Sequence, residues 1–205
     1  MIQSIVEGDG EVAAFPLLLE RLVAELGCYE AIGYSPFLEK RTGIVKEEKF
    51  KRAVQVVSDK SATRAIIVLF DADDDCARDL VPQMTKWAQE AVPSLPCAVI
   101  LARREYEAWF LAALESLRGH RRIRDSAQYD RNPEVVRGAK GVVSRFMPQN
   151  KPYSETADQA ALSAVFDLGQ AYRGASSFRK LVKEVCRLLG ELGHAPAVPE
   201  HWITG

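Results

Sequence analysis

Acidic residues follow three apolar segments of the chain, at the points where each segment ends. They are Glu7 and Glu11 after residues 2–6, Asp71 and Asp73 after residues 65–70, and Glu105 and Glu107 after residues 97–101. Ionised carboxylates brought close together repel each other by several kcal/mol unless protons or cations compensate. Hard divalent cations with oxygen ligands are the usual compensation. If the three pairs meet, the pattern predicts a site for one or two Mg²⁺ or Mn²⁺ ions.

Alternating strand and helix patterns indicate how these pairs would meet. We expect strands at residues 2–6, 28–34, 65–70 and 97–101, and helices at 11–26, 47–59, 76–91 and 105–117. Such alternation is typical of an α/β fold with a mostly parallel sheet and crossover helices. In open parallel sheets ligands bind beyond the carboxyl ends of the strands. The acidic pairs should therefore share one edge of the sheet. Pro16 predicts an irregular turn or restart in the first helix.

Some of these acids have a structural interpretation as well. Asp9, Asp74 and Asp75 stand where a helix cap or a first-turn acid is favoured. Glu105 and Glu107 are two residues apart, so on a regular helix they would diverge by about 200°. They could share an ion only if the helix begins after them.

The second half of the chain changes character at about Arg118. A polar, loop-like stretch precedes expected helices at residues 134–146, 156–173 and 176–192, and no strand pattern follows. We therefore expect an α/β core over residues 1–117 and a basic loop with a C-terminal helical cap over residues 118–205, packed together as one globular unit.

Basic residues are concentrated between residues 118 and 151. Nine lysines and arginines stand there against three acidic residues. A basic flank beside an acidic metal site suits a phosphate-backbone substrate. The candidate nucleic-acid-binding residues are Arg118, Arg121, Arg122, Arg124, Arg137 and Arg145. Tyr129, Phe146 and Tyr153 are candidates for stacking on unpaired bases. The alternative is a solvated surface with ordinary ion pairs.

Composition restricts the class of protein. The chain has 205 residues, 47% of them apolar, and a formal net charge of −1, which fits one globular unit and argues against a histone-like binder. No stretch approaches the roughly 20 apolar residues of a membrane span. The four cysteines form no CxxC pair, so neither a zinc cluster nor a disulfide framework is indicated. We expect a cytoplasmic protein without membrane contact.

The acidic motifs VEGDGE, IIVLFDADDD and AVILARREYEAWF resemble the Toprim domain. This is the metal-binding α/β fold of type IA and II topoisomerases, primases and the overcoming-lysogenization-defect nucleases. The segments RGAKGVVSRFMP, KPYSETADQAAL and SSFRKLV extend a closer similarity over nearly the whole chain. That similarity is to small stand-alone bacterial Toprim-like proteins of largely uncharacterised function.

The resemblance implies roles for particular residues. Glu7 would act in acid/base chemistry or metal binding, and Asp71 and Asp73 would hold Mg²⁺. Further acids hold a second metal in the overcoming-lysogenization-defect nucleases, and the matching positions are Glu11, Glu105 and Glu107. Those nucleases also place a lysine near the scissile phosphate, for which Lys140 is the first choice and Lys151 the second.

A metal-dependent nuclease acting on DNA or RNA is the leading functional hypothesis. Two divalent ions about 4 Å apart activate water and stabilise both oxygens of an in-line displacement. The chain lacks the ATPase part of that nuclease family and the tyrosine-bearing domain of a topoisomerase. By analogy, a separate ABC/SMC-like ATPase would be its partner in bacterial anti-phage defence. The oligomeric state stays open, with a homo-oligomer as one option.

Two other functions stay open. The first is a non-catalytic regulatory or binding subunit of an ATPase complex, which keeps the Toprim fold and its ion for structural reasons. The second is a receiver-like phosphoryl-transfer domain. A receiver would place its paired acids after the first strand and a lone aspartate after the third, which is the reverse of the order here.

Overall fold

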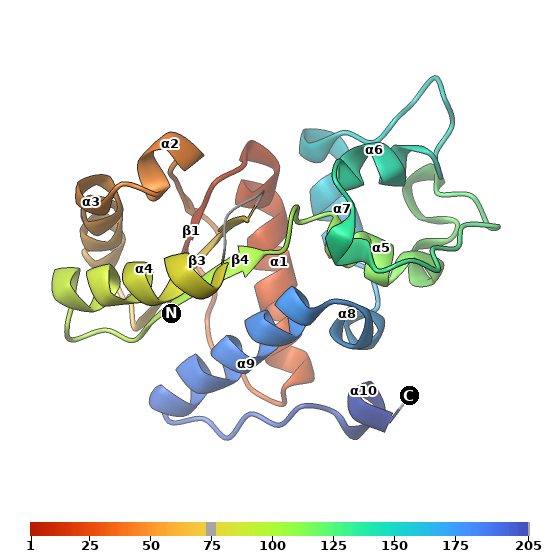
Figure 1. The fold of residues 1–205 in the computed structure, drawn as a ribbon. Coiled ribbons are helices and arrows are strands. Elements are labelled where there is room, and N and C mark those ends of the chain that lie inside the picture. Colours follow the sequence, from red (N-terminus) through yellow and green to blue (C-terminus); the bar gives the residue numbers. More distant parts are fainter. Residues whose placement is uncertain (73–76, 205) are drawn as a thin grey trace.

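Four parallel strands form a sheet in the order β2-β1-β3-β4 (Figure 1). The computed structural model describes residues 1–72 and 77–204. The strands are β1 (Ile2–Val6), β2 (Phe37–Leu38), β3 (Ala65–Asp71) and β4 (Cys97–Ala102). Helices flank this sheet, and the described residues after β4 form helices and loops only. The α/β fold with a parallel sheet and a C-terminal helical region is confirmed.

The strand register aligns the carboxyl ends of β1, β3 and β4. Val6 pairs with Leu69, and Asp71 at the end of β3 pairs with Ala102 at the end of β4. The residues that follow β1 and β4 therefore start beside the end of β3. This register brings the first acidic residue, Glu7, next to Asp71.

Apolar side chains cover both faces of the sheet. On one face, alternate residues of the strands pack against α3 (Glu47–Ser58) and α4 (Ala77–Ala91). On the other face they pack against α1 (Asp9–Glu25) and α9 (Ser176–Glu191). Figure 1 shows α3 and α4 together on one side, with α1 and α9 on the other. Such two-sided burial explains why β3 consists of six consecutive apolar residues before Asp71.

Short helices make up most of the rest. They are α2 (Arg41–Ile44), α5 (Ala108–Ala112), η1 (Leu114–Leu117), η2 (His120–Arg122), η3 (Pro133–Val135), α6 (Ala139–Ser144), the π-helical turn η4 (Glu155–Gln159), α7 (Ala160–Ser163), α8 (Leu168–Gly174) and α10 (Glu200–Thr204). Aromatic rings join this region to α9: Phe166 lies 5.6 Å from Phe110 and 5.8 Å from Phe178 between ring centroids. One hydrophobic cluster thus runs from the sheet into the helical region.

The expected strand at residues 28–34 is wrong. This segment makes only an isolated bridge between Ile2 and Ile32, and the edge strand is the later, two-residue β2. Tyr29 is 92% exposed, so the segment has no continuous buried face. At Gly33, an added Cβ would lie 2.1 Å from the side-chain oxygen of Gln3. The end of the Gln3 side chain therefore packs against the backbone at Gly33.

Three expected helices are shorter or broken. The helix expected at 105–117 begins at Ala108 and gives way to a 3₁₀ turn after Ala113. The one expected at 134–146 is interrupted by Gly138, whose φ is 71°. The segment 156–173 divides where Asp167 caps α8. Conversely, α1 runs unbroken through Pro16, so the expected irregular turn there is wrong.

Candidate functional site

A cleft of about 340 Å³ lies at the carboxyl edge of the sheet. Its charged lining comprises five carboxylates and three cations: Glu7, Asp9, Glu11, Asp71 and Glu155, with Lys40, Arg41 and Lys140. The acids come from the ends of β1 and β3, from the first turn of α1 and from η4. The cations come from the N-cap and first residue of α2 and from α6. The structure therefore brings together residues from four separate stretches of the chain, within 7–11, 40–42, at 71 and within 140–155.

Glu7 and Asp71 are adjacent because β1 and β3 are neighbouring parallel strands. The Oε2 atom of Glu7 accepts a hydrogen bond of 3.3 Å from the backbone amide of Asp71. The Oδ1 atom of Asp71 accepts one of 2.8 Å from the amide of Tyr106, beyond β4. These contacts fix both carboxylates at the strand ends.

Glu11 closes the N-terminus of α1 and is 4% exposed. Its Oε2 atom accepts hydrogen bonds from the amides of Gly8 (3.0 Å) and Glu7 (3.2 Å), groups that lack a partner within the helix. Burial raises the pKa of Glu11 to about 7, and the charge of Glu7 adds to this, although the amide hydrogen bonds act against it. The acidic first turn of α1 includes Asp9, as the capping interpretation expects.

Asp71 has a pKa raised well above its usual value. Burial is the largest cause, and the negative charges of Glu11, Glu107 and Glu7 raise the pKa further, while Lys140 lowers it. These carboxylates are thus close enough to disfavour each other's ionisation. A cation placed among them would relieve this repulsion.

Glu105 and Glu107 have different surroundings. The carboxylate of Glu105 accepts hydrogen bonds from the amides of Gly138 (2.8 Å) and Lys140 (3.2 Å), so it supports the start of α6. Although α5 begins after both acids, Glu105 does not line the cleft.

Glu107 is fully buried. Its Oε1 atom accepts hydrogen bonds from the Tyr153 hydroxyl (2.7 Å) and from Nε2 of Gln159 (3.3 Å). Its Oε2 atom has no partner in the described part of the chain. Burial raises the pKa of Glu107 to about 7. Tyr153, a candidate stacking residue, thus directs its hydroxyl to a buried acid.

Of the two candidate lysines, Lys140 lines the cleft. Its Nζ atom lies 2.7 Å from Oε1 of Glu155. Burial lowers the pKa of Lys140, but the hydrogen bond to Glu155 and the charges of Glu107 and Asp71 outweigh this and raise it. Lys151 is exposed and does not line the cleft.

Sequence reasoning missed Lys40 and Arg41. The guanidinium of Arg41 donates hydrogen bonds to the carbonyls of Asp71 and Ala72, lies 3.7 Å from Oε2 of Glu7 and sits over the Phe70 ring. It therefore holds the backbone where β3 ends. The sequence gives only one indication of their role, the Lys40-Arg41 pair itself. It follows β2, which has two residues and is too short to show a strand pattern.

Asp73, with Asp74 and Asp75, lies outside the described residues. Within residues 1–72 and 77–204, no group of three or more His, Cys, Asp or Glu side chains is arranged to hold a metal ion. The cleft thus gathers carboxylates at the carboxyl edge of the sheet, but the described residues do not form a preformed coordination shell for a metal ion.

Four arginines of the basic segment 118–151 are held by contacts within the protein. Arg121 and Arg122 lie 3.0 and 3.3 Å from Oδ1 of the buried Asp158. Arg118 donates a hydrogen bond to the carbonyl of Ala127, and Arg124 donates one to the carbonyl of Arg145. The remaining candidates are Arg137 and Arg145, which are exposed on either side of α6.

Fold and cleft define an α/β protein with an acidic site at the carboxyl edge of a parallel sheet. Residues 6–185 match the family described as a domain of unknown function, DUF4276, and the chain belongs to this family. No curated protein and no solved structure matches the chain. Among the described residues, no helix has the length and apolar character needed to cross a membrane.

Proposed function

We propose that the protein is a divalent-metal-dependent nuclease of the Toprim type. One observation carries the proposal: Glu7, Glu11 and Asp71 line one cleft at the strand ends together with Lys140. The raised pKa values of Glu11 and Asp71 support it, because a cation would favour the ionised form of both.

The donor set fits Mg²⁺ or Mn²⁺. Carboxylate oxygens are the ligands these ions prefer, and Glu7 and Asp71 would hold the first ion together with Asp73. Glu11 and Glu107, whose Oε2 atom has no partner among the described residues, are the candidates for a second ion. Glu105 is better explained as the support of α6.

Different residues of the chain would have different roles in phosphodiester cleavage. When bound, a divalent ion polarises a phosphoryl oxygen and lowers the pKa of water. The Lys140 ammonium group would neutralise charge that develops on the phosphate in the transition state. Arg41 would keep the end of β3 in place through its bonds to the carbonyls of Asp71 and Ala72.

The test is cleavage of a substrate panel with Mg²⁺, Mn²⁺ or EDTA. The panel contains supercoiled plasmid, linear duplex, single-stranded DNA and transfer RNA. Asp71→Asn should abolish metal-dependent cutting while the protein stays folded. Asp59→Asn, an exposed change at the end of α3, should cut as the wild type does. Equal cutting by Asp71→Asn would refute the proposed site.

A second candidate is a non-catalytic subunit that keeps the ion for structural reasons. The observation that favours it is the engagement of Glu105 and Glu107 in hydrogen bonds that support the fold. A folded protein that binds Mn²⁺ but cuts no substrate would support this candidate, as would loss of the fold in Asp71→Asn.

A partner ATPase in anti-phage defence remains part of the proposal under either function. It rests on the resemblance to the overcoming-lysogenization-defect nucleases alone. The corresponding experiment is copurification with the proteins encoded beside this chain, followed by the cleavage panel with ATP present.

A further inference from the structure

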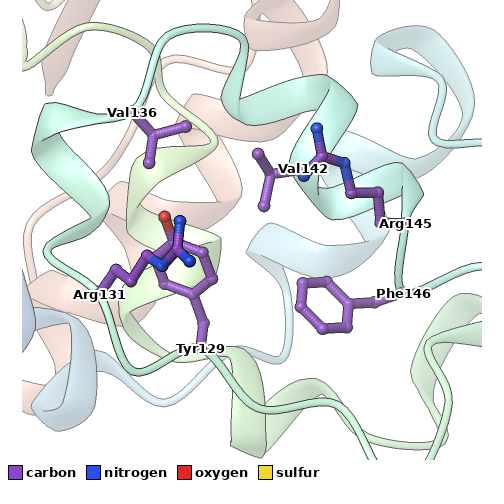
Figure 2. A pocket seen from close by; sticks show the side chains of 6 residues that line it. All are labelled: Tyr129, Arg131, Val136, Val142, Arg145 and Phe146. Atoms are coloured by element: carbon purple, nitrogen blue, oxygen red, sulfur yellow. The ribbon is translucent and has the colours of Figure 1, made fainter.

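A second pocket lies between a loop and the end of α6. It has a volume of about 330 Å³. Figure 2 shows its six lining side chains: Tyr129, Arg131 and Val136 from the loop before α6, and Val142, Arg145 and Phe146 from α6 and the residues after it. None of these residues lines the acidic cleft.

The lining combines flat apolar surface with unpaired positive charge. Two aromatic rings and two valines provide the apolar surface, and no carboxylate lines the pocket. Within the described part of the chain, the guanidinium groups of Arg131 and Arg145 have neither a hydrogen bond nor an ion pair. By contrast, Arg121 and Arg122 are held by Asp158. Arg131 and Arg145 therefore need not break an interaction with the protein in order to bind a ligand.

Hydrogen bonds fix the backbone at both ends of α6, which forms one side of this pocket. The amide of Arg124 donates to the carbonyl of Phe146 at 3.0 Å, and the Arg124 side chain donates to the carbonyl of Arg145. At the other end of α6, the carboxylate of Glu105 accepts from two amides. A preformed pocket binds at a lower entropic cost than a loop that must first be ordered.

The same helix borders both sites. Lys140 near the start of α6 lines the acidic cleft, and Arg145 at its end lines the second pocket. Five residues of helix correspond to about 8 Å along the axis. The two sites thus lie at opposite ends of the same short helix.

We propose that this pocket binds one unpaired nucleobase of the nucleic-acid substrate. Tyr129 and Phe146 provide the stacking surface, while Arg131 and Arg145 hold the adjoining phosphates. Unpaired bases are commonly recognised by stacking on aromatic rings beside cationic groups. The volume lies at the lower end of the range for ligand pockets, which suits a single base better than a longer segment. The inference rests on the proposed function for its substrate class: the enzyme would act on single-stranded or locally unpaired nucleic acid.

The test measures binding without cleavage. Fluorescence anisotropy in EDTA compares labelled single-stranded DNA, single-stranded RNA and a duplex. Tyr129→Leu and Phe146→Leu keep an apolar side chain but remove the ring, and each should weaken single-strand binding roughly 5- to 100-fold. Duplex affinity should change little. Arg131→Ala and Arg145→Ala should each weaken single-strand binding and lower the slope of log K against log salt by about 0.7.

Arg52→Ala is the matched control for loss of charge. Arg52 is exposed on α3, which covers the face of the sheet away from α1 and α9. Its replacement should leave single-strand affinity unchanged. Circular dichroism and thermal unfolding of each variant would establish that the fold is intact. A 2-aminopurine base in the single strand gives an independent measure, because stacking in the pocket should quench its fluorescence and the two leucine variants should restore it.

The outcomes separate this inference from the proposed nuclease function. If the wild type binds single strands and the leucine variants do not, the pocket is established even if no metal supports cutting. Absence of single-strand binding by the wild type, or wild-type affinity in all four pocket variants, would overturn the inference. Either result would be expected if the pocket binds a side chain of a partner protein and not a nucleobase. If the four pocket variants bind and cut as the wild type does, the nuclease proposal holds and the nucleobase pocket is refuted.

Discussion

Neutralising Glu107 should stabilise the metal-free protein. This carboxyl group is fully buried, and its Oε2 atom has no partner among the described residues. Burial raises its pKa from the usual 4.5 to about 7. Glu107→Gln keeps the shape of the side chain and an oxygen that accepts from Tyr153 and Gln159, but it removes the buried negative charge.

The size and the pH dependence of the effect follow from this pKa. A folded-state pKa above the unfolded one means that the folded protein binds the proton more tightly. The cost of ionisation is therefore absent below about pH 4.5, grows as the pH rises, and is complete above about pH 7. A change from 4.5 to about 7 corresponds to about 3 kcal/mol. For a chain of this length, Tm would rise by roughly 6–12 °C.

Urea and thermal unfolding in EDTA would measure the gain at about pH 8 and about pH 5. The gain should be near its full value at the higher pH and below about 1 kcal/mol at the lower. Glu48→Gln, which removes an exposed carboxylate from α3, should change stability little at either pH. The reasoning fails if Glu107→Gln is no more stable than the wild type at pH 8, or if the gain is equal at both pH values.

Three further changes test how the cleft and its supports are built. Burial raises the pKa of Glu134, but hydrogen bonds from the first residues of α9 outweigh this and lower it. Glu134→Gln should therefore lower the free energy of unfolding by about 1.5–3 kcal/mol at neutral pH. Urea unfolding should show this loss shrinking as the pH falls below about 4. Gly10→Ala would place Cβ 2.2 Å from a side-chain oxygen and 3.0 Å from a backbone oxygen of η4. Thermal unfolding should therefore show a loss of about 1–3 kcal/mol in the free energy of unfolding. The control is Gly141→Ala, whose Cβ meets nothing within 4 Å and which should show no such loss. Tyr153→Phe removes the hydroxyl that donates to Glu107 and should raise the pKa of that carboxyl further, as followed by ¹³C NMR titration; an unchanged pKa would mean that this hydrogen bond does not matter.

Long, regular elements were predictable from the sequence. The strand expected at 65–70 is β3, which ends one residue later, and the helix expected at 176–192 is α9, which ends one residue earlier. Both have many apolar residues with one consistent period, so local pattern and burial agree. The strand predicted at 28–34 was wrong because this segment pairs with the sheet through one bridge, between Ile2 and Ile32, and Tyr29 is exposed.

The site was predictable where it follows directly from the strand ends. The alternation of strands and helices predicts that the strand ends share one edge, and Glu7 and Asp71 meet there because β1 and β3 are neighbours, an order that the alternation does not specify. The separation of Glu105 from Glu107 was not predictable, since the partners of Glu105 are amides at the start of α6, more than thirty residues later in the chain. Arg41 was missed for a similar reason: its role depends on the carbonyls of Asp71 and Ala72 and on no feature of its own segment.

The hydrogen bonds of Glu105 to the start of α6 bear on how mutational data would be interpreted. Under the proposed function, a variant at Glu105 that lost activity would resemble the loss of a metal ligand, because this acid stands two residues from Glu107. In the structure, however, Glu105 anchors the helix that carries Lys140. Its loss would detach a positioned lysine from the sheet edge. Excess metal would not rescue such a variant, whereas lower temperature, which favours the ordered helix, would restore part of the rate.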